Sequence, residues 1–519
     1  MPSDAPSVLL AAAPPLTVLV LMTGLRMGGA KAGPVGWLVA LLIAVLRFGA
    51  GGDLLLYAHL RALVLTLDVV LIVWTALALY MVVRAAGALD VIAAWFGSLT
   101  GDPVLRVLLL GWVFASFLQG VGGFGVPVAV TAPLLVGIGL APLPAVIVPF
   151  IGHSWAVTYG SLGSSFIALT GATGLAPALL APPTSILLGL AAPVCGALAA
   201  YAAAGLRGLW RALPPLLVIG AVMALVQYVM SVIDLWNIAS ACAGLAGLAT
   251  GLLLTRGRRR RGTGATEAGS QKRRPSLALA IAPYVILIVL AVALIGVQPV
   301  KAALGQLRLS VQIPQLETSA GWVTGAGVVG IPLLVHGASV LLYSALLSFR
   351  LYRRRGWLGS GAAHEVLTGV RRQGLRPAIG ILAMVAMATV MQHAGMTRTL
   401  AEWLSRAVAP DWYALVGALI GALGSFMTGS NTNSNAVFAG LQMDSAQLLG
   451  LSVPLVLALQ TSAGAIASMM APAKILVGAS TVGIGQGDEG RVLRSLLLYG
   501  SLILAGLALV SWLLLRAGY

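Results

Sequence analysis

Long apolar runs separated by short polar segments dominate the sequence. Windows of about 20 apolar residues, enough to cross a ~30 Å hydrocarbon layer, recur from one end to the other. Strands of a membrane β-barrel would alternate polar and apolar residues instead. The pattern predicts an all-α polytopic membrane protein with about 12 transmembrane helices. Uninterrupted spans are expected at 8–25, 34–50, 63–83, 177–205, 214–233, 235–255, 277–298, 322–347, 377–396 and 494–515.

Two further apolar regions, about 104–170 and 412–484, are interrupted. Gln119–Pro127 contains four glycines and a proline and cannot continue as a regular helix. Ser430–Asn435 places six polar residues in a row between apolar runs. Polar backbone at membrane depth persists only where protein or a water-filled cavity satisfies it, and transporters bind substrate and coupling ions at such places. The interruptions are therefore predicted to form one binding site near the membrane midplane.

The two interrupted regions belong to an internal repeat. Ser116-Phe117-x-x-Gly120 recurs 309 residues later as Ser425-Phe426-x-x-Gly429. A partly amphipathic segment precedes each region, at 85–102 and 398–411. The predicted organisation is N-terminal helices at 1–84, a first repeat at 85–175, connecting helices at 176–392, a second repeat at 393–484 and a C-terminal helix at 485–519.

Basic residues give the chain its net charge of +17 and predict its orientation. Segments 256–274 and 350–376 hold eight and seven Lys/Arg and are predicted to be cytoplasmic loops. Counting spans from these loops, the first repeat begins inside and the second outside, which is the inverted topology of many alternating-access carriers. No basic residue precedes the first apolar segment, so a retained helix is expected rather than a cleaved signal. Nucleic-acid binding is not expected, because no basic face with aromatic platforms accompanies the charge.

Hydroxyl, carboxamide and exposed backbone groups of the interruptions suit a small carboxylate that bears a hydroxyl. The same oxygens suit sodium about equally well. Polar stretches at 153–161 and 460–464 are expected to line the same cavity. Lys474 lies in an apolar run, and it is expected either to face an anion or to reach toward the interface. The predicted substrate-binding residues are Gly122, Gly123, Phe124, Gly125, His153, Ser154, Tyr159, Thr428, Ser430, Asn431, Thr432, Asn433, Ser434, Asn435, Thr461, Ser462 and Lys474.

Proton coupling requires a group that titrates. His153 and Asp68 are the candidates, and Asp68 is the only acid deep in a span of the first half. Asp68 can equally have a structural role, paired with Arg84 or with a backbone group. The other histidines are weaker candidates: His336 and His393, and His59 and His364 in predicted loops.

Enzymatic signatures are missing from the sequence. It contains no G-x-S-x-G, H-E-x-x-H, paired CxxC or P-loop motif, and Cys195 and Cys242 lie in apolar spans. No catalytic residue, cofactor or metal site is therefore expected, and transport must be secondary.

The motifs at the two interruptions resemble those of the lactate permease family. Gly123–Val130 is similar to that family's Gly-Phe-Gly-Thr-Pro-Val-Ala-Ile, and Thr428–Ala436 to its Thr-Gly-Ser-Asp-Thr-Ser-Ser-Asn-Ala. The resemblance spans most of the chain. It implies a multi-pass protein of the bacterial inner membrane that imports lactate, glycolate and related 2-hydroxymonocarboxylates with protons, by alternating access and without a cofactor.

Three departures from the family pattern bear on substrate and coupling ion. Asn431 stands where the family commonly has Asp, Val126 replaces a threonine, and Ala467-Ser468-Met469 replaces Gly-Lys-Met. A sodium-coupled carrier of another carboxylate remains an alternative, favoured by Asn431, and a channel is a second one. The sequence leaves the oligomeric state open.

Overall fold

The computed structural model describes the chain except residues 1–3, 26, 98, 124, 256–275 and 485–488. Eleven helices of the described residues are long and apolar enough to cross a membrane. One of them, α10 (Pro177–Val232), bends at Gly205 and has the length for two crossings. Large apolar side chains on its outer surface are exposed, as lipid contact requires, among them Leu190 and Leu225. The predicted all-α polytopic class is confirmed.

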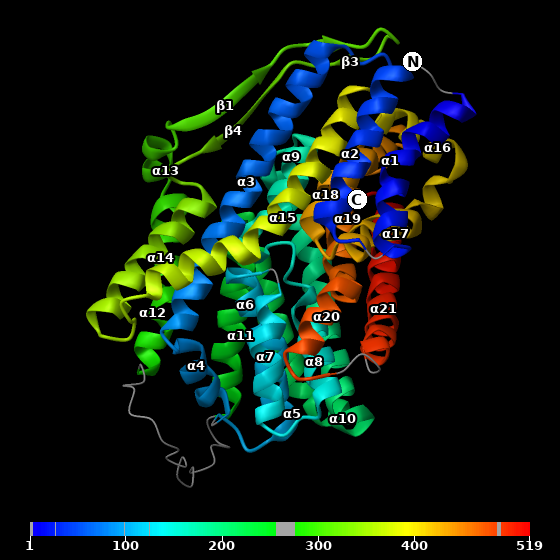
Figure 1. The fold of residues 1–519 in the computed structure, drawn as a ribbon. Coiled ribbons are helices and arrows are strands. Elements are labelled where there is room, and N and C mark those ends of the chain that lie inside the picture. The colour runs from blue at the N-terminus through cyan, green and yellow to red at the C-terminus, as the bar shows by residue number, and fades with distance from the viewer. Residues whose placement is uncertain (1–3, 26, 98, 124, 256–275, 485–488) are drawn as a thin grey trace.

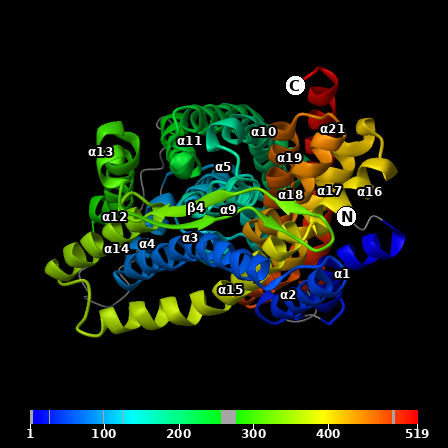
Figure 2. The same ribbon diagram turned by 90° about the horizontal axis from the view of Figure 1, so that it is seen from above.

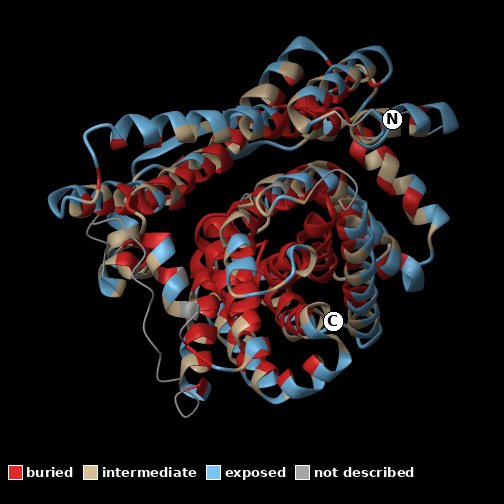
Figure 3. Cartoon of the chain, turned by 60° about the horizontal axis from the view of Figure 1, so that its bottom comes forward, coloured by how far each residue is buried: buried red, intermediate tan, exposed pale blue. Residues whose placement is uncertain are grey.

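The helices form an outer layer and a rounded bundle (Figures 2 and 3). The layer contains α1 (Ala5–Thr23), α2 (Gly29–Leu46), α3 (Gly52–Ala85), α12 (Leu277–Ala291), α14 (Gly337–Arg354) and α15 (Ala362–His393). The bundle is built from the two interrupted regions, α10, α11 (Ala239–Thr255) and α21 (Glu489–Arg516), and its interior is largely buried. Helices α9 and α18 of the bundle pack against each other and against α3 and α15, which joins the two parts.

The first interrupted region follows α3. It consists of α4 (Ala88–Gly97), α5 (Pro103–Leu108), the π-helix η1 (Leu109–Phe114), α6 (Ala115–Val121), α7 (Val126–Gly137), α8 (Pro142–Ser154) and α9 (Gly160–Thr173). The segment α5–η1–α6 runs into the bundle and α7 runs back out, so this segment and α7 form a hairpin. Helices α8 and α9 are two parts of one broken helix.

The second interrupted region follows α15 in the same order. Its elements are α16 (Met396–Ala407), α17 (Pro410–Thr428), α18 (Asn431–Leu448), α19 (Val453–Ala467), the 3-10 turn η5 (Ser468–Met470) and α20 (Pro472–Ser480). Gly87 and Gly395, 308 residues apart, both end a long helix in the left-handed conformation, with φ of 67° and 82°. Helices α4 and α16 lie at opposite ends of the molecule (Figure 1), as two repeats of inverted topology require.

The predicted span at 322–347 is wrong in its first half. Residues before α14 form a two-stranded ribbon, in which β1 (Arg308–Ile313) pairs antiparallel with β4 (Gly327–Pro332). Short strands β2 (Leu316–Glu317) and β3 (Val323–Thr324) pair beyond it. β-branched residues favour a strand here and glycines disfavour a helix, although the mean hydropathy of the segment suits either. Between α12 and the ribbon lie η4 (Val292–Gly296) and α13 (Gln298–Leu304).

Two predicted loops are also corrected. Segment 350–376 is mostly helical, because α14 continues to Arg354 and α15 starts at Ala362, so His364 lies in a helix. His59 likewise lies within α3, which starts eleven residues before the predicted span. Charged residues near the terminus of a helix lower the hydropathy of that segment, but the helix continues through them. The predicted loop 256–274 falls outside the described residues.

Candidate functional site

Each repeat contributes a hairpin tip to the interior of the bundle. The first tip lies between α6 and α7, where Gly125 has a φ of 87°, and the second lies at Gly429, with a φ of 68°. Ser430 caps α18, since its Oγ accepts a hydrogen bond from the Asn433 N–H at 3.3 Å. The N-termini of α7 and α18 thus begin at the tips, where their partial positive charge favours an anion. Phe124 of the first tip lies outside the described residues.

Each repeat also contributes a broken helix. Between α8 and α9 the chain leaves helical geometry, and Ser161, Leu162 and Gly163 all have left-handed backbone, with φ of 49°, 49° and 83°. A non-glycine residue in this region costs about 1–3 kcal/mol and persists where the surroundings enforce it, often at functional sites. The second break, at η5, has no such residue before α20 begins at Pro472.

Tip and break of the same repeat touch. A Cβ at Gly123 would overlap Ser161 Oγ, and one at Gly160 would lie 2.5 Å from Gln119 Nε2. In the second repeat, a Cβ at Gly429 would lie 3.5 Å from Lys474 Cγ. The contact between Gly123 and Ser161 therefore leaves no room for a side chain. The contact between Gly429 and Lys474 has ordinary van der Waals spacing.

Side chains of both repeats meet in one buried polar cluster. Asn431 Nδ2 donates to Thr158 Oγ1 at 3.1 Å and to Thr461 Oγ1 at 3.2 Å. Asn435 Nδ2 donates to the Ser165 carbonyl and to Thr461 Oγ1, both at 2.8 Å. The Thr432 hydroxyl lies 3.1 Å from that of Ser165. We refer to these six residues as the cross-repeat cluster: Thr158, Ser165, Asn431, Thr432, Asn435 and Thr461. Every member is buried.

Among the described residues, several buried oxygens of this cluster or of α17, α18 and α19 have no hydrogen-bond partner. They are Asn431 Oδ1, Asn433 Oδ1, Asn435 Oδ1, Ser425 Oγ and Ser462 Oγ. An unsatisfied buried polar atom costs about 1–3 kcal/mol, so a group of them suggests a place where a ligand, ion or water completes the bonding.

A lysine and a histidine lie beside the second tip. Lys474 is half-buried, and its stem packs near Gly429. His153 is buried within electrostatic range of Lys474, and its Nδ1 is bonded to the Pro149 carbonyl at 2.5 Å. With the described residues, Lys474 makes no ion pair within 4.0 Å. Lys474 can thus present positive charge to an anion between the two repeats.

Four predicted site residues use their hydroxyls for internal bonds. Tyr159 donates to the Ala181 carbonyl at 2.7 Å, and Ser154 to the Ile151 carbonyl at 2.8 Å. Ser434 and Thr428 donate to the Gly421 and Gly424 carbonyls, each at 2.8 Å. Conversely, Thr158 and Ser165 enter the cluster without having been singled out from the sequence. Thr158 lies in a recognised polar stretch, but nothing in the sequence distinguishes Ser165 from other small helix residues.

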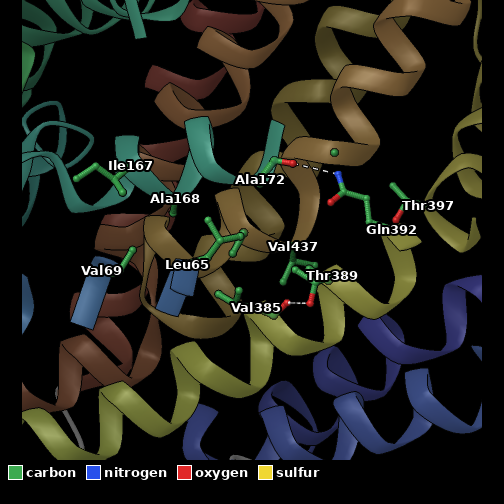
Figure 4. A pocket seen from close by; sticks show the side chains of 13 residues that line it. Leu65, Val69, Ile167, Ala168, Ala172, Val385, Thr389, Gln392, Thr397 and Val437 are labelled. Atoms are coloured by element: carbon green, nitrogen blue, oxygen red, sulfur yellow. Dashed lines mark hydrogen bonds between the residues drawn. The ribbon is translucent and has the colours of Figure 1, made fainter. Parts of the chain in front are cut away.

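A small cavity lies where the bundle meets the outer layer (Figure 4). It has a volume of about 20 Å³, room for a single water, and α3, α9, α15 and α18 supply most of its apolar lining. Gln392 of α15 donates to the Ala172 carbonyl of α9 at 3.0 Å across it. This junction is therefore closed to a carboxylate-sized molecule in the conformation described.

Asp68 lies apart from the cluster. It does not pair with Arg84; its Oδ1 lies 2.5 Å from His336 Nε2 at the start of α14.

Two hairpin tips and two broken helices meet around buried polar groups, some of which are unsatisfied. This arrangement defines a membrane transporter of the inverted-repeat class. The model of the L-lactate permease family matches residues 7–517, so the chain belongs to that family. The predicted family is confirmed.

Characterised relatives are similar over nearly their whole length. The glycolate permease GlcA of Escherichia coli K12 is 28% identical over 94% of this chain and 92% of its own. The L-lactate permease of Bacillus subtilis 168 is also 28% identical, with the same coverage. Among solved structures, Neisseria gonorrhoeae MtrF aligns with 96% of this chain and 97% of its own, at 14% identity and a TM-score of 0.49.

Proposed function

We propose that the protein imports L-lactate, glycolate and related small 2-hydroxymonocarboxylates with protons across the inner membrane of a bacterium. Relatives named for L-lactate and for glycolate, similar over more than nine-tenths of the chain, support this substrate class. The predicted coupling to protons agrees with the family resemblance.

The observation that carries the proposal is the position of Lys474 beside Gly429 of the second tip, two residues before Asn431 of the cross-repeat cluster. Lys474, which forms no ion pair with the described part of the chain, and the N-terminus of α18 supply positive charge for a carboxylate. The unsatisfied amide oxygens of Asn431 and Asn435 can accept a hydrogen bond from the substrate hydroxyl. A 2-hydroxymonocarboxylate presents both groups within a few atoms.

Alternating access follows from the construction of the site. Because its two halves come from different repeats, a movement of one repeat against the other opens the site to one side at a time. The closed junction at Gln392 fits a conformation in which one path is shut.

Uptake of labelled L-lactate into proteoliposomes tests the proposal. An imposed pH gradient without sodium should drive uphill accumulation that unlabelled glycolate inhibits. Lack of accumulation with a pH gradient would contradict proton coupling, and lack of uptake under every gradient would contradict the substrate class. Flux that neither saturates nor runs uphill would indicate a channel.

Sodium coupling is the second candidate, and one observation favours it. Asn431 Oδ1 and Ser425 Oγ, both unsatisfied, face the same point beside Gly464, where a Cβ would overlap the first and lie 3.0 Å from the second. Neutral oxygens that converge in this way suit a small hard cation. Accumulation driven by a sodium gradient at equal pH would establish this alternative.

A further inference from the structure

Asp68 and His336 form a close contact between α3 and α14. Their side chains are 21% and 7% exposed, and Asp68 Oδ1 lies 2.5 Å from His336 Nε2. Asp68 stands within the apolar run Leu63–Val83. An acid at membrane depth is costly and is expected to serve a function together with a specific partner.

The start of α14 holds His336 in one tautomer. His336 is the N-cap residue, and its Nδ1 accepts a hydrogen bond from the Ala338 N–H at 3.3 Å. Since Nδ1 must be unprotonated to accept, the single ring proton lies on Nε2 and points to Asp68. An additional proton must therefore bind the Asp68 carboxylate or displace the helix cap.

The pair lies next to the broken helix of the first repeat. A Cβ at Gly337 would lie 3.5 Å from Ile72 Cδ1 of α3 and 3.6 Å from Leu162 Cβ. Leu162 is the middle residue of the left-handed turn, and its neighbour Ser161 packs against Gly123 of the hairpin tip. The start of α14 thus connects the Asp68–His336 pair to the substrate site through two consecutive packing contacts.

Few other charges lie along the elements that surround the pair. Neither α9 nor residues 377–392 of α15, which both pack on α3, contain an acid, a basic residue or a histidine. Arg61 lies two turns away on α3 itself. The other ionisable residues of elements packed on α3 are Asp90, Tyr284, Arg308, Glu317, Tyr343, Arg350, Tyr352, Arg353, Arg354, His364, Glu365, Arg371, Arg372, Arg376 and His393. The acids of these neighbouring elements are Asp90, Glu317 and Glu365, and none of them lies on α9 or on residues 377–392 of α15.

We infer that Asp68, held by His336, is the site that binds and releases the transported proton. This inference rests on the proposed function. A proton that binds Asp68 neutralises the carboxylate and weakens its bond to His336 Nε2–H, which frees the first turn of α14 to shift against α3. The left-handed turn at Ser161–Gly163 lies against that first turn and would move with it, which couples protonation to the hairpin tip. Binding forms an O–H bond on the Asp68 carboxyl group, and release of the proton on the other side of the membrane breaks it; no other covalent bond changes.

The test compares net uptake with exchange in proteoliposomes. Asp68→Asn imitates the protonated acid, because its amide oxygen still accepts from His336. Net accumulation of labelled L-lactate under a pH gradient should disappear, so that the inside-to-outside ratio falls to about one. Exchange of labelled for unlabelled L-lactate at equal pH should stay within about twofold of wild type, because it needs no proton movement.

His336→Asn and Asp234→Asn complete the design. Asparagine is a good N-cap, so His336→Asn keeps the start of α14 and should lower accumulation more than exchange. Asp234, paired with Lys301 at 2.7 Å, lies away from Asp68, and Asp234→Asn should alter neither mode. Full accumulation by Asp68→Asn, or equal loss of both modes, would overturn the inference.

Infrared spectroscopy of the purified protein tests proton binding without any substrate. Wild type should show the C=O stretch of a protonated carboxyl group that disappears as the pH is raised, and Asp68→Asn should lack this component while Asp234→Asn keeps it. An unchanged band in Asp68→Asn would overturn the inference even if lactate proved not to be the substrate. A wild type that titrates normally but does not accumulate lactate would instead contradict only the proposed function.

Discussion

The two repeats build corresponding parts of the site from different chemistry. The first tip consists mainly of glycine and contributes backbone, and Gly123 packs so closely on Ser161 that no side chain fits. The second tip contributes side chains, through Asn431, Thr432 and Asn435. We therefore propose that the first repeat mainly determines the shape of the site and that the second supplies most of the groups that distinguish one substrate from another.

The broken helices differ in a corresponding way. The first break holds two strained non-glycine residues, Ser161 and Leu162, in left-handed conformation, whereas the second is a short 3-10 turn followed by Pro472 and Lys474. If this division is right, substitutions in the first repeat should act through steric fit and those in the second through hydrogen bonds and charge. Four predictions test it, from the largest expected effect to the smallest.

Gly123→Ala should lower the maximal rate of L-lactate uptake about 100-fold, because its methyl group would displace the first tip from Ser161. Gly122→Ala is the matched control, since its Cβ meets only ordinary contacts at 3.4 Å or more and its φ is negative. Ser161→Gly should partly restore Gly123→Ala by removing the overlapping hydroxyl. Equal rates for Gly122→Ala and Gly123→Ala would show that the close packing at the first tip is unimportant.

Lys474→Met should raise the KM for L-lactate about 10–100-fold. This is the loss of affinity expected when a hydrogen bond to a charged group, worth ~1.5–3 kcal/mol, is removed. Methionine retains the packing near Gly429 but not the charge. Lys301→Met, on the ion pair with Asp234, serves as the control and should leave KM unchanged. An unaltered KM in Lys474→Met would remove this residue from the site.

Asn435→Asp should reduce uptake about tenfold, because a carboxylate would face the Ser165 carbonyl, which cannot donate a hydrogen bond. Asn431→Asp should stay within about threefold of wild type, since its partners are the rotatable hydroxyls of Thr158 and Thr461. Initial rates of both variants at equal expression provide the comparison. The reverse order of effects would contradict the bonding assigned to the cluster.

Ser165→Ala should have the smallest effect, a two- to threefold fall in uptake from the loss of about 0.5 kcal/mol of hydrogen bonding to Thr432. Its carbonyl bond to Asn435 remains. Thr170→Ala, whose hydroxyl bonds only to the Ile167 carbonyl of the same helix, provides the control. A tenfold loss in Ser165→Ala would show that the first repeat also supplies essential side-chain chemistry.

Much of the architecture could be predicted from the sequence, because membrane spans are long and glycine or polar interruptions in them are rare. The tips at Gly122–Gly125 and Ser430 follow from this contrast. The ribbon at β1 and β4 could not, since the hydropathy of a short apolar run suits strand and helix alike.

Individual partners were harder to predict than positions. Asp68 was recognised as a buried acid, but its bond to His336 joins residues 268 positions apart and leaves no periodic signal. The contribution of Ser165 arises from its backbone carbonyl as much as from its hydroxyl, which no side-chain pattern indicates.

Substrate protection at both tips tests the central claim, that the two repeats share one site, most directly. Gly125→Cys and Ser430→Cys place a thiol at a half-buried position of each tip, in a background with Cys195→Ala and Cys242→Ala. The rate of maleimide labelling would be measured in membranes with and without L-lactate, with Ser319→Cys in the segment between β2 and β3 as the control. L-lactate should slow labelling at both tips over the same concentration range and leave the control unchanged. Protection at one tip alone, or at neither, would contradict a shared site.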